Sequence, residues 1–241
     1  MTDPVPSAPP ASASAFEDMM DIWYAPSTVF RRRENGGFGI ALVVLCVAIG
    51  VLAFAGRGGM QPIMDAEMSR QMAMAQKSNP SMTADQLAAG KAIGEKFAAL
   101  APIVATIFTA IAIFLLGFLI WIVGKFFGSK QTLTAAFVVS TFAAFPWIAE
   151  ALFNVIQGLL IDFSGAKSRY AASASLARFM DPDTTPVRLL AMAGRIDVFV
   201  IWWAILVAIG LKVTGKLTTA QAGIAAVIVW LVATLPQLIR G

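Results

Sequence analysis

The uncharged stretch between Lys96 and Lys125 is the feature that most limits what this chain can fold into. Residues 97–124 are almost entirely apolar and contain no charged side chain. A helix of this length, at about 1.5 Å per residue, exceeds the hydrocarbon core of a bilayer, about 30 Å. Within lipid, backbone N–H and C=O groups must pair inside the chain, which an α-helix achieves. The stretch therefore predicts a membrane-spanning helix.

Further apolar runs raise the prediction to five membrane-spanning helices. They are expected at about residues 38–56, 97–124, 131–161, 187–213 and 219–239. Hydrophobic residues make up 58% of the 241 residues and charged residues only 13%, whereas soluble domains carry roughly 25% charged residues. The expected fold class is all-α: a polytopic transmembrane helical bundle that occupies residues 35–241.

The N-terminal 34 residues differ in composition from the rest of the chain. Residues 1–14 are rich in Pro, Ser and Ala, which predicts a disordered tail. Residues 15–34 predict an amphipathic interfacial helix, since one helical face gathers the apolar side chains of Phe16, Met19, Met20 and Trp23. Candidate contacts with a partner or with lipid headgroups are Trp23, Tyr24, Arg31, Arg32 and Arg33.

Basic side chains near the helix ends predict how the chain crosses the membrane. They cluster beside short connecting segments: residues 31–33, Lys125 with Lys130, and Lys212 with Lys216. Basic residues in such positions favour the cytoplasmic side. Five crossings then give a cytoplasmic N-terminus and an external C-terminus, with the long loops 57–96 and 163–194 outside.

A group of polar side chains interrupts the third and fourth predicted helices: Glu150, Asn154, Gln157 and Asp197. The first three are spaced by four and three residues and so share a helical face. Because the third helix runs outward and the fourth inward, Glu150 and Asp197 are expected at similar depths near the outer boundary. Ionisable groups in membrane helices are candidates for function or for structural pairing.

Two hypotheses for this polar cluster stay open. In the structural one, Asp197 bonds to Asn154, Gln157 or Arg195 and holds the two helices in register. In the functional one, both carboxylates form a cation or proton site.

Composition also argues against several functional classes. The chain has no histidine and its single cysteine is Cys46, which removes the commonest general base and the usual metal ligands. We therefore expect no catalytic residues, metal site or cofactor, and a protein that is not an enzyme. The net charge of +4 is small and no stripe of basic and aromatic residues suggests a nucleic-acid partner.

Two segments, "YAPSTVFRRR" and "RIDVFVIWWAILVAIGLKVTGKLTTAQA", together with the five predicted crossings, resemble the Yip1-domain family, particularly its bacterial members. The resemblance covers about residues 20–238, and its family-like positions are Asp197, Phe199 and Trp202. It implies a polytopic helical fold in the bacterial inner (plasma) membrane, with a cytoplasmic N-terminus and an external C-terminus. Eukaryotic members are associated with Rab GTPases, but their "DLYGP"-type motif has no clear position here. The resemblance transfers no catalytic residues.

Two functional hypotheses follow. The first is a non-enzymatic membrane scaffold or adaptor of Yip1 type, which contacts the lipid bilayer, membrane-protein partners or a second copy of itself through the amphipathic segment and the outer loops. The alternative is a small ion or solute transporter that uses the intramembrane carboxylates Glu150 and Asp197 together with Asn154.

Overall fold

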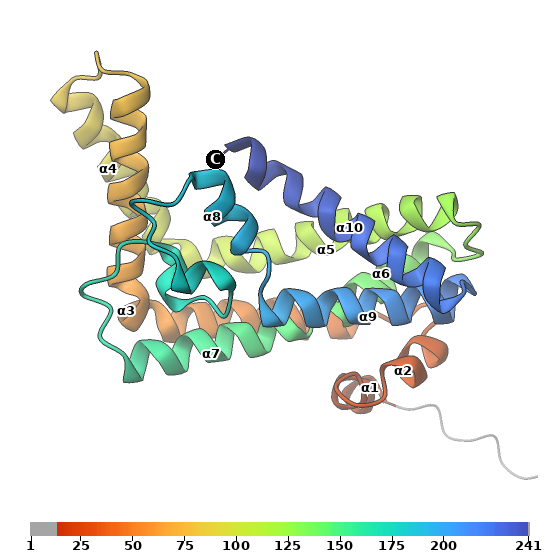
Figure 1. The fold of residues 1–241 in the computed structure, drawn as a ribbon. Helices are drawn as coiled ribbons and strands as arrows, with labels where there is room; N and C mark the ends of the chain where they lie inside the picture. The colour runs from red at the N-terminus through yellow and green to blue at the C-terminus, as the bar shows by residue number, and fades with distance from the viewer. Residues whose placement is uncertain (1–13, 241) are drawn as a thin grey trace, which may run out of the picture.

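The computed structural model describes residues 14–240, apart from the side chains of Ala98 and of residues 236–240. The predicted N-terminal tail lies outside the described residues except for Ser14, which accepts a hydrogen bond from the Glu17 N–H and caps the first helix. Figure 1 shows long helices packed side by side, with a helical hairpin projecting at one end.

Among the residues that the structure describes, four helical stretches are long and apolar enough to cross a membrane: Gly39–Ser78, Ala101–Phe126, Leu133–Leu160 and Val198–Gly215. A further helix, α10 (Thr219–Arg240), packs against α5 (Ala101–Phe126) and α9 (Val198–Gly215) and is apolar over Thr219–Leu235. The predicted fold class, an all-α polytopic helical bundle, is confirmed.

The first membrane helix is much longer than the sequence predicted. Instead of ending near residue 56, α3 (Gly39–Ser78) continues to Ser78, which gives it a total length of 40 residues. It contains Pro62 in its interior. The chain then turns into α4 (Ala84–Ala99), which begins at a reciprocal cap between Thr83 and Gln86. Residues 65–99, which we call the projecting hairpin, extend away from the bundle (Figure 1).

The third and fourth predicted helices are both broken. The third consists of α6 (Leu133–Ala143) and α7 (Pro146–Leu160), with Pro146 in the first turn of α7, where its missing N–H costs no hydrogen bond. The fourth consists of α8 (Val187–Ala193) and α9. Between α8 and α9 the backbone pairs with residues 174–176 instead, through Leu176 N–H to the Ile196 carbonyl at 3.1 Å. Tertiary pairing thus interrupts the helix just before Asp197.

The short loops that the charge pattern assigned to one side lie together in the structure. The Lys130 N–H donates to the Gly215 carbonyl at 3.1 Å, and Gln131 Nε2 donates to Thr214 Oγ1 at 2.6 Å. Lys216 Nζ lies 3.0 Å from a carboxylate oxygen of Glu34. We call this the basic end of the bundle. A large apolar cluster that includes Val139, Leu211 and Val229 fills the bundle near it.

The N-terminal segment forms two short helices, α1 (Ala15–Asp21) and α2 (Pro26–Arg32). Its predicted apolar face is divided between the protein and the surface, because α2 packs against α9 and draws part of the segment onto the bundle. Met19 is buried, whereas Phe16 and Met20 are 73% and 52% exposed. Trp23 contacts Trp202, with ring centroids 5.0 Å apart.

Two of the three arginines in this segment face the protein itself. Arg32 and Arg33 form ion pairs with Asp18, whose side chain is fully buried, and Arg32 also pairs with Asp21. Arg31 is exposed. The side chains proposed to meet anionic lipid are therefore divided, and Arg32 and Arg33 clamp α1 to the end of α2.

Candidate functional site

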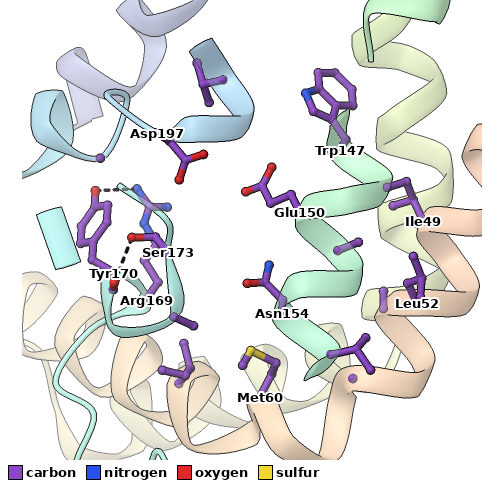
Figure 2. A pocket seen from close by; sticks show the side chains of 18 of the residues that line it. Ile49, Leu52, Met60, Trp147, Glu150, Asn154, Arg169, Tyr170, Ser173 and Asp197 are labelled. Carbon is purple, nitrogen blue, oxygen red and sulfur yellow. Dashed lines mark hydrogen bonds between the residues drawn. The ribbon is translucent and has the colours of Figure 1, made fainter. Parts of the chain in front are cut away.

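A cavity of about 780 Å³ lies between the helices, in the half of the bundle nearer the projecting hairpin. Its walls come from α3, α5, α7, the α8–α9 junction and the 3-10 turn η1 (Arg169–Ala172), with one residue of α10. The volume falls within the roughly 300–1,000 Å³ that is usual for ligand sites. Figure 2 shows its interior.

Glu150 and Asn154 project into this cavity from successive turns of α7 (Figure 2). The predicted helical face is therefore correct for these two residues. Neither side chain forms a hydrogen bond or ion pair with any other described residue. Both thus present free polar atoms to the cavity.

Asp197 reaches the same cavity from the start of α9. Its carboxylate points toward that of Glu150 in Figure 2, and its side chain is almost fully buried, at 4% exposed. One oxygen, Oδ1, accepts the Phe199 N–H at 2.8 Å and caps α9. The other oxygen has no protein donor in the described part of the chain. Glu150 and Asp197 thus line one cavity.

Gln157 does not belong to this cavity. Its Nε2 donates to the Ala172 carbonyl at 2.7 Å, and its Oε1 accepts from Arg178 Nη1 at 2.7 Å. These bonds fasten the loop that contains η1 to the C-terminal part of α7. Of the partners suggested for Asp197, none of Asn154, Gln157 and Arg195 is bonded to it in the described structure.

Three arginines line the cavity as well, and sequence reasoning did not group them: Arg57, Arg169 and Arg195. Arg195 Nε donates to Thr234 Oγ1 at 3.3 Å, and Arg169 Nη2 donates to the Tyr170 hydroxyl at 3.0 Å. The described residues contain no ion pair between these guanidinium groups and Glu150 or Asp197. The arginines come from three distant segments, so no spacing in the sequence relates them.

The electrostatic environment of Arg195 links the two sets of charges. Burial lowers the pKa of its guanidinium below the ordinary value, and the negative charges of Glu150 and Asp197 act in the opposite direction. Arg169 lowers the same pKa further. The negative charges of both carboxylates thus act on Arg195, although it forms no ion pair with either of them.

Trp203 lines the cavity with its apolar surface and not with its indole N–H. Its side chain is 3% exposed, and the indole N–H is buried without a hydrogen-bond partner among the described residues. A buried donor without an acceptor costs about 1–3 kcal/mol. This cost arises within the apolar packing of the bundle.

The remaining predicted positions have structural contacts. Phe199 packs on Phe153, with ring centroids 5.8 Å apart, and Trp202 packs on Trp23. Tyr24 is 73% exposed, and its hydroxyl donates to Asp21 at 2.5 Å. The family-like positions therefore divide: Asp197 serves the cavity, and Trp202 holds the N-terminal segment.

Chemically, the cavity offers acceptors for a cation and donors for an anion. Carboxylates accept only, and guanidinium groups donate only. No group of three or more His, Cys, Asp or Glu side chains among the described residues could hold a metal ion. The arrangement is suited to recognising charge on a bound molecule.

The comparisons with known proteins agree with the architecture. The family model of the Yip1 domain matches residues 20–239, nearly the whole chain. Neither the curated proteins nor the solved structures contain a match. The chain is a multi-pass membrane protein, and it belongs to the Yip1 domain family.

Proposed function

We propose that this protein is a non-enzymatic membrane protein whose role is to bind a small charged molecule, or the charged part of a larger one, in the cavity. The observation that carries this proposal is the meeting of Glu150, Asn154 and Asp197 in one cavity with their polar atoms largely free. Charged groups inside a membrane protein are costly and usually mark a pathway or a site.

Binding from one side fits the geometry better than a continuous channel. The cavity occupies the half of the bundle nearer the projecting hairpin, whereas the other half is filled by the apolar cluster that includes Val139, Leu211 and Val229. Transport of an ion or solute, the alternative that the sequence suggested, would require this packed half to open. Binding requires no such change.

Filling the cavity tests this function. Ala151 lines the cavity, so Ala151→Phe places a ring in it. Leu152, its neighbour on α7, is 47% exposed, so Leu152→Phe adds bulk on the outer surface of the same helix. Native mass spectrometry of protein extracted under mild conditions should show a bound molecule on the wild type and on Leu152→Phe, but not on Ala151→Phe.

The opposite result would end the proposal. Equal retention of bound mass by all three proteins would place the ligand elsewhere, and bare protein in every case would leave the cavity without a ligand. Circular dichroism and thermal unfolding in detergent verify that the phenylalanine variants are folded.

A scaffold or adaptor role is the second candidate, and the projecting hairpin favours it. Measured along its helix axis, which bends, α3 is about 60 Å long for its 40 residues, twice the thickness of the hydrocarbon core. On the hairpin, Met74, Ile93 and Phe97 are 39%, 56% and 63% exposed. Exposed apolar side chains beyond the membrane are suited to a contact with a partner protein.

Site-specific photo-crosslinking in native membranes tests the scaffold role. A photoreactive residue at Ile93 should form a discrete adduct with one partner, and the same residue at Phe126, 83% exposed near the basic end, should not. Identical adducts from both positions, or none from Ile93, would remove the hairpin as a contact surface.

For localisation, we propose the bacterial inner membrane with the basic end in the cytoplasm. The proposal is supported by Arg31, Lys125, Lys130, Lys212 and Lys216, which gather at one end of the bundle beside short loops. The projecting hairpin and the cavity then belong to the outer side.

A further inference from the structure

The cavity is lined by nearly equal numbers of acidic and basic side chains, and these two sets form no ion pairs with each other in the described residues. Glu150 and Asp197 supply two negative charges, and Arg57, Arg169 and Arg195 supply three positive ones, so three minus two leaves +1. The described residues contain no ion pair that joins the two sets. Asp197 is buried, Glu150 and Arg195 are partly buried, and Arg57 and Arg169 are exposed. A molecule that supplies both signs would neutralise the buried charge of Asp197 and pair with the arginines that border the cavity.

The negative part of the site fits an ammonium group. The free oxygens of Glu150 and Asp197 and the side-chain carbonyl of Asn154 are acceptors that face the same space (Figure 2). A primary ammonium offers three N–H donors, whereas a quaternary ammonium offers none. Asp197 is 4% exposed, so its free oxygen is reached only from the cavity.

The positive part fits a phosphate or a carboxylate. Arg57, Arg169 and Arg195 each retain N–H groups beyond the contacts described above. Guanidinium groups bind phosphate and carboxylate with paired N–H donors.

The rest of the wall is apolar. Ile49, Leu52 and Leu116 line the cavity from α3 and α5, and Trp147 and Val200 line it from α7 and α9. A water-soluble zwitterion would leave these side chains without a partner, whereas acyl-chain carbons next to a headgroup would pack against them.

We infer that the cavity is a headgroup site for an aminophospholipid, with its ammonium between Glu150 and Asp197 and its phosphate toward Arg57, Arg169 and Arg195. This inference rests on the proposed binding function and names its ligand class. The shared chemistry is a primary ammonium a few bonds from an anionic group, which a free phosphoethanolamine also carries.

Lipid retention measured by native mass spectrometry on the full chain tests the inference. The purified protein is exchanged into detergent with equimolar phosphatidylethanolamine, phosphatidylcholine and phosphatidylglycerol. Phosphatidylethanolamine should be retained about tenfold more than either of the others, because only its headgroup combines N–H donors with a phosphate. Soluble O-phosphoethanolamine in excess should compete weakly, since it lacks the acyl chains.

The variants Glu150→Gln and Asp197→Asn remove the two negative charges and preserve shape. Asparagine is also a good helix N-cap, so α9 should keep its start. Each variant should lower phosphatidylethanolamine retention about tenfold, and Glu95→Gln, at an exposed site on α4, should leave it unchanged. Circular dichroism confirms that the variants fold.

Each other outcome overturns the inference in a distinct way. If phosphatidylglycerol or phosphatidylcholine is retained equally well and Ala151→Phe releases it, cavity binding stands and the aminophospholipid assignment fails. Full competition by O-phosphoethanolamine makes the ligand a soluble zwitterion. If no lipid is retained and O-phosphoethanolamine does not bind, the aminophospholipid fails, and the cavity-filling experiment decides the binding function separately.

Discussion

Gly59 of α3 and Gly158 of α7 meet backbone to backbone. A Cβ built on Gly59 would lie 2.2 Å from the carbonyl oxygen of Gly158, closer than any side chain can approach. The two glycines thus fix how closely α3 and α7 pack at the outer end of the bundle, beside the cavity. Small residues allow such close crossings in membrane proteins.

Gly59→Ala should destabilise the protein by about 1–3 kcal/mol, because the added methyl group forces α3 and α7 apart. Gly58→Ala is a matched control: no atom lies within 4 Å of a Cβ at Gly58, and alanine favours the helix by up to about 1 kcal/mol. Thermal unfolding in detergent measures both. A Gly59→Ala protein as stable as Gly58→Ala would contradict the close crossing.

Asp18→Asn should release the N-terminal segment. The substitution removes the buried carboxylate charge that pairs with Arg32 and Arg33, at a cost of about 1–3 kcal/mol, while Arg32 keeps its pair with Asp21. Limited trypsin digestion should then cut within residues 31–33 far faster than in the wild type. Glu17→Gln, at an exposed neighbouring position, should digest like the wild type. Equal protection of all three proteins would show that the clamp is not needed.

Gln157→Ala should loosen the loop over the cavity. It removes the donor to the Ala172 carbonyl and the acceptor for Arg178, two buried or partly buried hydrogen bonds. Backbone amides in residues 168–176 should exchange with deuterium about tenfold faster. Asn154→Ala removes a side chain without such bonds and should leave exchange in this loop unchanged. Unaltered exchange in Gln157→Ala would assign the anchoring to other contacts.

The exposed side chains of α1 should contact the membrane surface. Phe16, Met20 and Tyr24 recur every fourth residue and are all at least half exposed. In a Cys46→Ser background, an environment-sensitive fluorophore on Phe16→Cys should shift to the blue in vesicles and be quenched by spin-labelled lipid. A fluorophore on Ser27→Cys, an exposed polar position of α2, should respond less. Equal responses would argue against an oriented interfacial helix.

Cysteine accessibility should place the two ends of the bundle on opposite sides of the membrane. In the same cysteine-free background, an impermeant maleimide should label Ser81→Cys, at the tip of the projecting hairpin, in cells with a permeable outer envelope. Asn35→Cys, near the basic end, should label only after the inner membrane is disrupted. Labelling of both positions from one side would overturn the proposed orientation and the count of crossings with it.

The parts of the fold that the sequence predicted are those governed by local chemistry. Uncharged runs had to form helices, because lipid offers no partner for backbone groups. The meeting of Glu150 and Asp197 followed from helix rise and chain direction alone.

The parts that were missed depend on contacts between distant segments. The first apolar run predicts a helix that ends near residue 56, just before Arg57 and two glycines. The residues beyond them include strong helix formers such as Ala, Met, Glu and Gln, and these continue α3 to Ser78. The break before Asp197 arises from pairing with residues 174–176. Arg169 and Arg195 join the cavity only through that same pairing, which no local pattern reveals.

The continuity of α3 has a mechanical consequence. One helix forms a wall of the cavity through Ile49 and Arg57, then bends away from the bundle and carries the projecting hairpin (Figure 1). Pro62 lies near this bend and removes one backbone hydrogen bond, which favours a kink there. A change in the angle of this kink would therefore move the hairpin tip and the cavity wall together.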